Sequence, residues 1–191
     1  MKSGPVGLLI LSVVLVVSTF ALAADPAKVD KERQDIRKRT KDILAQLYKA
    51  EPSAKATVQK SAGYAVFSNF GMKIFVAGSG TGKGVAVDNK TKKEVFMKMI
   101  ELQAGLGFGA KKFSLVWVFE TPDKFAKFID SGFEIGGQTS VAAKTGDKGA
   151  AFQGALAVAP GIWLYQLTEK GVALELTAKG TKYYKDDDLN G

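Results

Sequence analysis

The sequence contains no cysteine and no histidine among its 191 residues. Their absence excludes disulfide bonds, the Ser-His-Asp triad, the Cys-His pair and nearly all zinc and copper sites. The chain therefore lacks the residues of the commonest hydrolytic and metal-dependent sites. We expect neither an enzyme nor a bound cofactor or metal.

The first 23 residues have the pattern of a secretory signal peptide. Lys2 is a minimal charged start, residues 6–20 are apolar, and Ala21-Leu22-Ala23 fits the small-x-small cleavage rule. The apolar run of about 15 residues is short for a membrane span of ~20 residues, although an uncleaved anchor is the alternative. We therefore predict an exported protein, periplasmic or secreted, with a core that must hold the fold without disulfides.

Basic residues outnumber acidic ones, 27 to 19. Removal of residues 1–23 would take away one basic residue, Lys2, and no acidic residue, which leaves a net charge of +7. An exported protein meets little nucleic acid, so an anionic membrane surface is the expected partner. The same charge would also serve ordinary solubility.

Residues 24–62 form the predicted helical segment. Asp25 followed by Pro26 is a favourable helix start, and Pro52 should end the first helix. A second, shorter helical turn is expected from Pro52 to Ala62. The first helix carries an apolar stripe at helical spacing: Val29, Ile36, Thr40, Ile43, Leu44, Leu47 and Tyr48.

The polar face of this helix is mostly basic, with eight basic and four acidic residues over positions 28–50. Such a helix either packs its stripe on the domain or lies on an anionic membrane, and both hold if only the basic face touches lipid. The predicted lipid-binding residues come from this helix and from a basic loop at 144–149: Arg33, Arg37, Lys38, Lys41, Lys144 and Lys148.

Residues 63–191 are predicted to form a mainly β core. Short strands are expected at 64–68, 72–77 and 83–88. The glycine-rich segment 77–84 invites comparison with a P-loop, but Gly84 stands where a Ser or Thr should hold magnesium, and a strand follows instead of a helix. We predict a hairpin loop there.

The stretch from Ile100 to Phe119 alternates small or apolar residues with polar residues and glycine. This period of two predicts two strands, and Lys111-Lys112 is the predicted turn of a long antiparallel hairpin. Three alternate glycines, Gly105, Gly107 and Gly109, leave one face bare. The bare strip indicates strong curvature, a covering helix or, third, a ligand groove.

A short mid-chain helix is predicted after Thr121-Pro122, with a buried face that contains Phe125 and Phe128 and a stop at Gly132. Further strands are expected at 133–143, 151–158, 162–167 and 172–178. The carboxylates on strands are interpreted as solvent-facing: Glu101, Glu120, Glu134 and Glu175. Asp186-Asp187-Asp188 lacks the spacing of a calcium loop and is expected to form a solvated turn.

Several motifs, in order along the chain, resemble those of the SYLF domain, a lipid-binding family. The matching segments cover roughly residues 40–190: Ala62-Gly-Tyr-Ala-Val-Phe67, Gly105-Leu-Gly-Phe-Gly-Ala110, residues 133–143, Lys170-Gly-Val-Ala-Leu-Glu-Leu176 and the tail 180–190. The sequence departs from the family pattern at Ser68, where proline is common, and at Lys144, where glycine is common.

The resemblance implies binding to phospholipid membranes, and it implies no enzymatic activity. Some eukaryotic members also bind actin, but for an exported copy that resembles the bacterial members we do not expect actin as a partner. The expected fold is α+β and mainly β: an antiparallel curved sheet or barrel-like domain with an N-terminal amphipathic helix and a short mid-chain helix. The alternatives for function are a periplasmic carrier of a lipid or apolar ligand inside a β-barrel, and an envelope protein-interaction module.

Overall fold

The computed structural model describes residues 25–74, 77–104, 109–135, 152–169, 171–173 and 181–191. Within these ranges, the side-chain surroundings of residues 69–80 and 101–112 are not described. The predicted signal peptide therefore lies outside the described residues, as do Lys144 and Lys148 of the basic loop.

The first three helices begin and end close to the positions predicted from the sequence, whereas the fourth lies where a solvated turn was predicted. The described helices are α1 (Pro26–Ala50), α2 (Ser53–Lys60), α3 (Pro122–Ser131) and α4 (Asp187–Asn190). The Asp25 carboxylate caps α1 by accepting a hydrogen bond from the backbone N–H of Ala27 at 3.1 Å. Gly132 ends α3 with a positive φ of 71°, a conformation that suits glycine. The Thr121 side chain, in contrast, makes no capping hydrogen bond.

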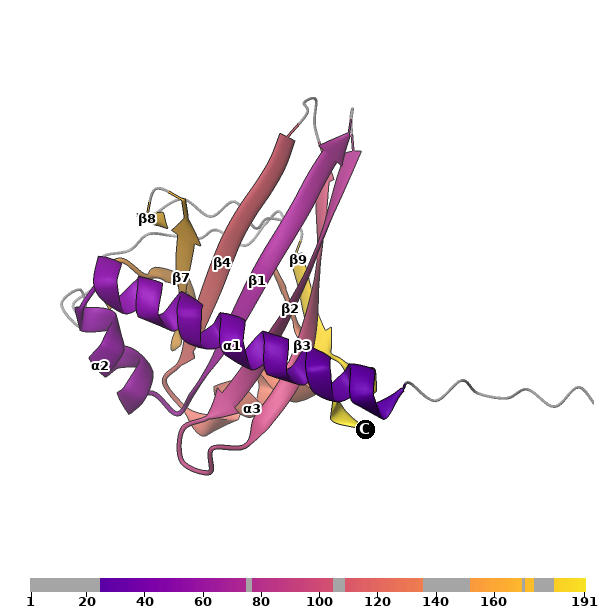
Figure 1. The fold of residues 1–191 in the computed structure, drawn as a ribbon. Helices are drawn as coiled ribbons and strands as arrows, with labels where there is room; N and C mark the ends of the chain where they lie inside the picture. Colours follow the sequence, from indigo (N-terminus) through magenta and orange to yellow (C-terminus); the bar gives the residue numbers. More distant parts are fainter. Residues whose placement is uncertain (1–24, 75–76, 105–108, 136–151, 170, 174–180) are drawn as a thin grey trace, which may run out of the picture.

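The described strands build one antiparallel sheet. They are β1 (Gly63–Ile74), β2 (Ala77–Asp88), β3 (Glu94–Ala104), β4 (Gly109–Phe119), β5 (Phe133–Ile135), β6 (Leu156–Ala159), β7 (Ile162–Thr168), β8 (Gly171–Ala173) and β9 (Thr181–Lys185). Their order is β5-β9-β3-β2-β1-β4-β7-β6, and β8 pairs with β7. The sheet is curled into a half-barrel (Figure 1), which confirms the predicted fold class.

The predicted central hairpin of residues 100–119 is wrong. β3 pairs with β2 and β9, whereas β4 pairs with β1 and β7, so β1 and β2 lie between the two strands. The predicted turn at Lys111-Lys112 lies inside β4. A period of two shows which face a side chain occupies but not which strand is its neighbour, and that is why the sequence pattern misled here.

The predicted loop at 77–84 is also wrong, because these residues are part of the long strand β2. Glycine is required by the close approach of β1. A Cβ on Gly84 would collide with the carbonyl oxygen of Val66, and a Cβ on Gly82 would lie 2.8 Å from the carbonyl oxygen of Ser68. The segment is therefore a glycine-rich strand, and its exclusion as a P-loop stands.

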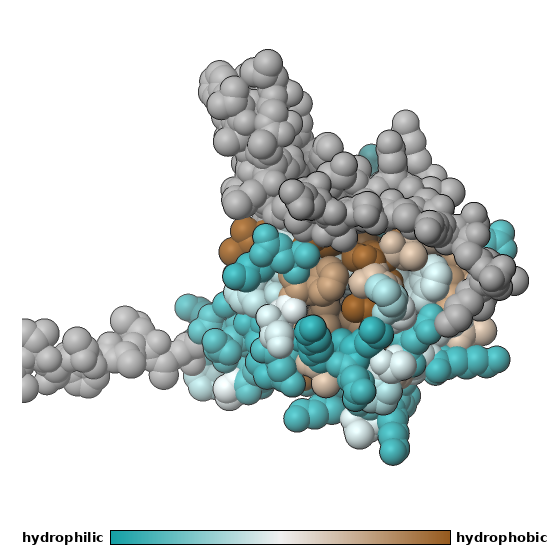
Figure 2. All heavy atoms as spheres, turned by 180° about the vertical axis from the view of Figure 1, so that it is seen from behind, coloured by the Kyte–Doolittle hydropathy of each residue, from teal (hydrophilic) through white to brown (hydrophobic). Residues whose placement is uncertain are grey.

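The two faces of the sheet pack against different helices. α1 crosses the outer face (Figure 1), where Ile43 and Leu47 of the predicted stripe are buried against Val66 and Val116. On the other face, Phe125 and Phe128 of α3 join an aromatic core. Seen from that side, the apolar side chains gather in the middle, with hydrophilic side chains beside and below them (Figure 2).

Aromatic rings fill the described part of this concave face. Trp117 and Tyr183 are fully buried and meet edge to face with ring centroids 4.9 Å apart. Phe67 contacts Tyr183 with centroids 5.0 Å apart, and Phe128 contacts Trp117 at 5.4 Å. Such pairs add to the stabilisation from buried apolar area. The interior of the half-barrel is thus a packed core in the part of the chain that the structure describes.

Candidate functional site

Arg33 and Arg37, two of the predicted lipid-binding residues, hold α1 to the rest of the fold. The Arg33 guanidinium donates hydrogen bonds to the carbonyl oxygens of Leu189 at 2.9 Å and Gly191 at 3.1 Å. Arg37 Nε lies 2.7 Å from Glu94 Oε2, and its guanidinium lies 5.2 Å from the centroid of the Phe96 ring. Both arginines therefore dock the helix.

Lys38 and Lys41, in contrast, are exposed on α1 and make no ion pair with a described residue. Of the predicted groove glycines, Gly105 and Gly107 lie outside the described residues. Gly109 is the first residue of β4, and its surroundings are not described. The structure therefore brings Lys38 and Lys41 together on one helix but does not place the loop lysines or the glycine strip.

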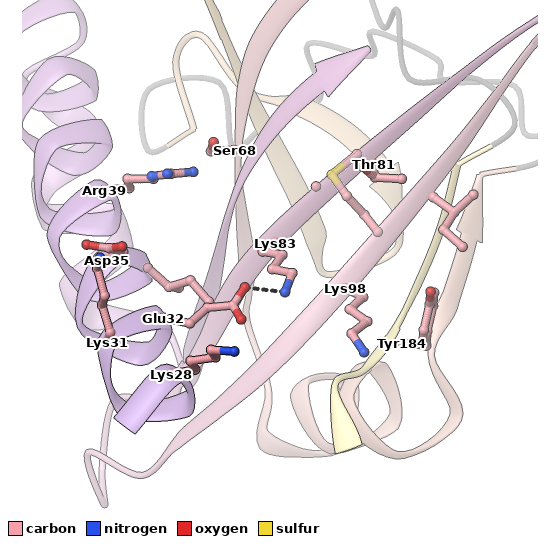
Figure 3. Close-up of a pocket in the computed structure, with 14 residues that line it drawn as sticks. Lys28, Lys31, Glu32, Asp35, Arg39, Ser68, Thr81, Lys83, Lys98 and Tyr184 are labelled. Atoms are coloured by element: carbon pink, nitrogen blue, oxygen red, sulfur yellow. Dashed lines mark hydrogen bonds and ion pairs between the residues drawn. The ribbon is translucent and has the colours of Figure 1, made fainter. Parts of the chain in front are cut away.

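A groove of about 620 Å³ lies between the amino-terminal half of α1 and strands β2, β3 and β9 (Figure 3). Charged side chains of α1 form one wall: Lys28, Lys31, Glu32, Asp35 and Arg39. In Figure 3, Arg39 and Lys28 extend from the helix over the sheet, whereas Lys31 and Asp35 lie along the helix, farther from the strands.

The floor of the groove is a polar row that runs straight across four strands. Ser68 of β1 pairs with Lys83 of β2, Lys83 pairs with Lys98 of β3, and Lys98 pairs with Tyr184 of β9. Residues directly opposite in neighbouring strands share a face of the sheet, so these four side chains all point toward the groove. The next row adds Thr81, which pairs with Ile100.

The row changes to apolar residues on the side that α1 covers. The neighbouring row, two residues along each strand from Ser68, Lys83 and Lys98, consists of Val66, Val85 and Phe96. All three are buried. The helix therefore seals the apolar rows and leaves the polar row open beside it. Ile100 is 39% exposed at the other side of the polar row, which gives the groove one accessible apolar side chain.

Two lysines of the floor are already paired. Lys83 Nζ forms an ion pair with Glu32 of α1, and both side chains remain partly exposed. Lys98 Nζ lies 2.9 Å from Asp186 Oδ1 and 2.9 Å from Asp188 Oδ2. Hydrogen bonds to these two carboxylates raise the pKa of Lys98, and the same contact with Lys98 lowers the pKa of Asp188.

The solvated turn predicted for residues 186–188 is wrong for Asp186, whose side chain is 0% exposed. Its neighbours Asp187 and Asp188 are exposed, as predicted. Asp186 lies directly before the short helix α4, and its buried carboxylate contacts Lys98 of the interior strand β3. The sequence offers no signal for this burial, because three consecutive aspartates are typical of an exposed turn.

The cations on the helix wall of the groove have no such partners. Among the described residues, none of the ion pairs involves Lys28, Lys31 or Arg39. With Lys83 and Lys98 the groove contains five basic side chains, against Glu32 and Asp35 of its lining and the two carboxylates that hold Lys98, Asp186 and Asp188. The balance is a small net positive charge, and the cations without a described partner lie on the helix wall. The arrangement therefore favours an anion.

Sequence reasoning missed Lys83, Lys98 and Tyr184 as groove residues. Lys83 falls in the segment interpreted as a loop, and Lys98 precedes the stretch interpreted as the central hairpin. The alternation of Lys83 with Val85 and Val87 would have placed this lysine on the same face as the apolar residues under α1. The register that aligns the row across the strands is not encoded in any local pattern.

The described ranges contain no cluster of three or more aspartate or glutamate side chains that could hold a metal ion. None of the described helices combines the length and the apolar character that a transmembrane span needs.

Comparison with known proteins agrees with the motifs read from the sequence. Residues 100–191 match the Ysc84 family, whose description is "Las17-binding protein actin regulator". Beta cell expansion factor A of Aeromonas veronii is 32% identical over 167 residues, which cover 86% of this chain and 61% of that protein. The chain thus matches about three fifths of the length of this relative. These matches confirm the family that the motifs predicted: residues 100–191 match the Ysc84, or SYLF, family, and the similarity to the relative extends over most of the chain.

Proposed function

We propose that this protein is an exported, peripheral membrane protein that binds anionic phospholipid surfaces through the outer surface of α1 and α2. Membership of the SYLF family suggests lipid binding. The pattern of residues 1–23 supports export, and the net positive charge of the chain supports an anionic partner.

The observation that carries the proposal is the charge of the exposed side chains on these two helices. Eight exposed basic residues lie there: Lys28, Lys31, Lys38, Arg39, Lys41, Lys49, Lys55 and Lys60. Three exposed acidic residues accompany them: Asp30, Asp35 and Asp42. The apolar stripe of α1 is occupied by packing on the sheet, so the basic face is what α1 offers to a membrane.

Surface attachment fits the described structure better than a carrier role. A carrier would need room for an acyl chain inside the half-barrel, and in the described residues that space is occupied by Phe67, Trp117 and Tyr183. The basic helices, in contrast, are available on the outer face without any rearrangement of the core.

The test is charge reversal at two exposed lysines of α1. Each basic side chain near an anionic leaflet contributes on the order of 1 kcal/mol. Lys38→Glu/Lys41→Glu should therefore weaken cosedimentation with phosphatidylglycerol-containing vesicles at least roughly 30-fold. Binding of the unmodified protein should also fall between low and physiological salt.

The matched control reverses two exposed lysines elsewhere, Lys90 in the β2–β3 turn and Lys127 on α3. Lys90→Glu/Lys127→Glu changes the net charge equally, but it leaves the α1–α2 surface intact and should retain most of the binding. Binding that ignores salt and survives the α1 reversal would contradict the proposal. Lipid copurifying with that protein, identified by mass spectrometry, would then favour the carrier.

A further inference from the structure

The groove beside α1 contains cations that no ion pair among the described residues uses. Lys98 is neutralised by Asp186 and Asp188, and Lys83 by Glu32. Lys28 and Arg39 extend over the sheet without a carboxylate partner among the described residues (Figure 3). These two cations approach the polar row from the helix side, so an anion in the groove would be enclosed by α1 and by the strands.

We propose that this groove binds a phosphate monoester group, which Lys28 and Arg39 hold from the helix and the polar row holds from the sheet. For a ligand carried by a lipid, the proposal rests on the membrane function proposed above. It adds that the membrane contact has a specific headgroup site beside the non-specific basic surface. The exposed lysines Lys38 and Lys41 attract the protein to any anionic membrane, and the groove selects lipids whose headgroup is a phosphate monoester.

The charge and hydrogen-bonding groups of the groove match this ligand class. A phosphate monoester carries about −1.5 to −2 charges at neutral pH and has three strong acceptor oxygens. The guanidinium of Arg39 can hold two of these oxygens at once, and the ammonium of Lys28 acts as a compact point charge. Hydroxyl groups that line the same groove add further donors: Ser68, Thr81 and Tyr184.

The ion pair between Glu32 and Lys83 makes the site adjustable. Lys83 is 43% exposed and Glu32 39% exposed, so this pair is weak and solvated. A dianion in the groove can displace Glu32 toward solvent and recruit Lys83 as a third cation. A phosphate diester, with a single negative charge, competes less well with the Glu32 carboxylate.

Ile100 makes the groove suitable for the glycerol end of a lipid as well as for a free phosphate ester. Its side chain is exposed and lies next to Thr81 in the register of β2 and β3. A small apolar contact of this kind can cover the carbon atoms next to the phosphate. The shared chemistry is the monoester phosphate, and the experiment separates its two sources.

The experiment uses one soluble probe and two kinds of vesicle. The soluble probe is sn-glycerol 3-phosphate, titrated by calorimetry. The vesicles contain phosphatidic acid, a monoester, or phosphatidylglycerol, a diester, with matched surface potential. The groove variant is Lys28→Gln/Arg39→Gln, and the matched control is Lys38→Gln/Lys41→Gln, which removes the same charge outside the groove.

We expect the unmodified protein to bind glycerol 3-phosphate or to prefer phosphatidic acid vesicles at least tenfold. The groove variant should lose that binding or preference at least tenfold, while the control variant keeps it within twofold. The control variant should weaken binding to both vesicle types equally. Thermal melting should be unchanged in both variants, because the altered side chains are exposed.

The outcomes distinguish this proposal from the membrane function. Preference for phosphatidic acid without binding of glycerol 3-phosphate supports the groove with lipid as its source. Binding of glycerol 3-phosphate without vesicle binding supports the groove with a soluble ester and overturns the membrane function. Salt-dependent binding to both vesicle types, with no preference and no glycerol 3-phosphate binding, overturns the groove and leaves the membrane function. A preference that the groove variant retains also overturns the groove.

Discussion

At the scale of single residues, the contact between Lys98 and Asp186 is the most consequential feature that the sequence conceals. The Asp186 carboxylate is fully buried, and Lys98 is 28% exposed. Removal of one member of a buried ion pair leaves an uncompensated charge, which usually costs about 3–5 kcal/mol. The second carboxylate, Asp188, is exposed, so water can solvate its charge when Lys98 is removed.

We expect Lys98→Met to lower the free energy of unfolding by about 3 kcal/mol, at the lower end of that range because Lys98 is partly exposed. Urea denaturation measures this change. The matched variant Lys185→Met removes a lysine whose partner Asp130 is 70% exposed, at 3.6 Å, and should change stability by less than about 0.5 kcal/mol. Equal effects of the two substitutions would contradict a structural role for the Asp186 pair.

The pH dependence of the Lys98 contribution follows from the directions of the two pKa shifts. The pKa of Lys98 is raised in the fold, so its stabilisation is present below its ordinary pKa of 10.5 and is lost as pH rises beyond the folded value. The pKa of Asp188 is lowered in the fold, so the stabilisation that Asp188 contributes is lost as pH falls below its ordinary pKa of 3.8. The stabilisation from the Lys98–Asp188 contact should therefore stay constant from pH 5 to 9 (roughly the interval between the two ordinary values), which the difference in unfolding free energy between the unmodified protein and Asp188→Asn measures.

At the scale of secondary-structure elements, α1 divides its basic residues between two tasks. Arg33 and Arg37 reach the C-terminal residues and the sheet, whereas Lys38 and Lys41 are exposed and form no ion pair with a described residue. The residues were indistinguishable in the sequence, since all four lie on the polar part of the helix. Their separation arises because Arg33 and Arg37 flank the buried residue Ile36 and are within reach of the neighbouring strands.

We predict that Arg37→Ala lowers the free energy of unfolding by about 1–2 kcal/mol, whereas Lys38→Ala changes it by less than about 0.5 kcal/mol. Arg37 loses both its ion pair with Glu94 and its position over the Phe96 ring. A double-mutant cycle with Glu94→Ala, followed by urea denaturation, should give a coupling energy of about 0.2–1 kcal/mol. Zero coupling would show that the ion pair does not contribute to docking of α1.

At the scale of the whole molecule, the two ends of the described chain are fastened to each other and to the sheet. The C-terminus lies near the amino-terminal end of α1 (Figure 1), where Arg33 binds the carbonyl oxygens of Leu189 and Gly191. The Asn190 side chain donates to the carbonyl oxygens of Phe96 and Asp186 at 2.7 Å each. It also accepts a hydrogen bond from the Phe96 N–H at 3.0 Å.

Asn190→Ala should therefore lower the free energy of unfolding by about 1.5–4.5 kcal/mol, because three hydrogen bonds are lost at roughly 0.5–1.5 kcal/mol each. Thermal or urea denaturation measures the loss. Asp187→Ala is the control, since Asp187 is exposed in the same short helix and should be nearly neutral. If both variants unfold alike, α4 contributes through its backbone alone.

Local patterns were sufficient for the three longer helices and for the faces of several strands. Contacts within one helical turn explain the start of α1 at Asp25-Pro26 and the end of α3 at Gly132. The helical period of apolar residues explains the buried stripe of α1 and the buried residues Phe125 and Phe128 of α3. The motifs also sufficed to identify the family. Each of these features depends on residues that are close together in the sequence.

Only the tertiary structure decided the strand order, the buried Asp186 and the groove. β3 and β4 are neighbours in sequence but are separated by β1 and β2 in the sheet, because alternation determines a face and leaves the partner strand open. Lys83, Lys98 and Tyr184 become one row only through that order. Whether a basic residue can bind a ligand depends on whether a carboxylate already pairs with it. That carboxylate can lie about half the chain away in sequence, as Asp186 does from Lys98. The sequence by itself therefore determined the elements and the family, and long-range pairing determined which cations are free to bind.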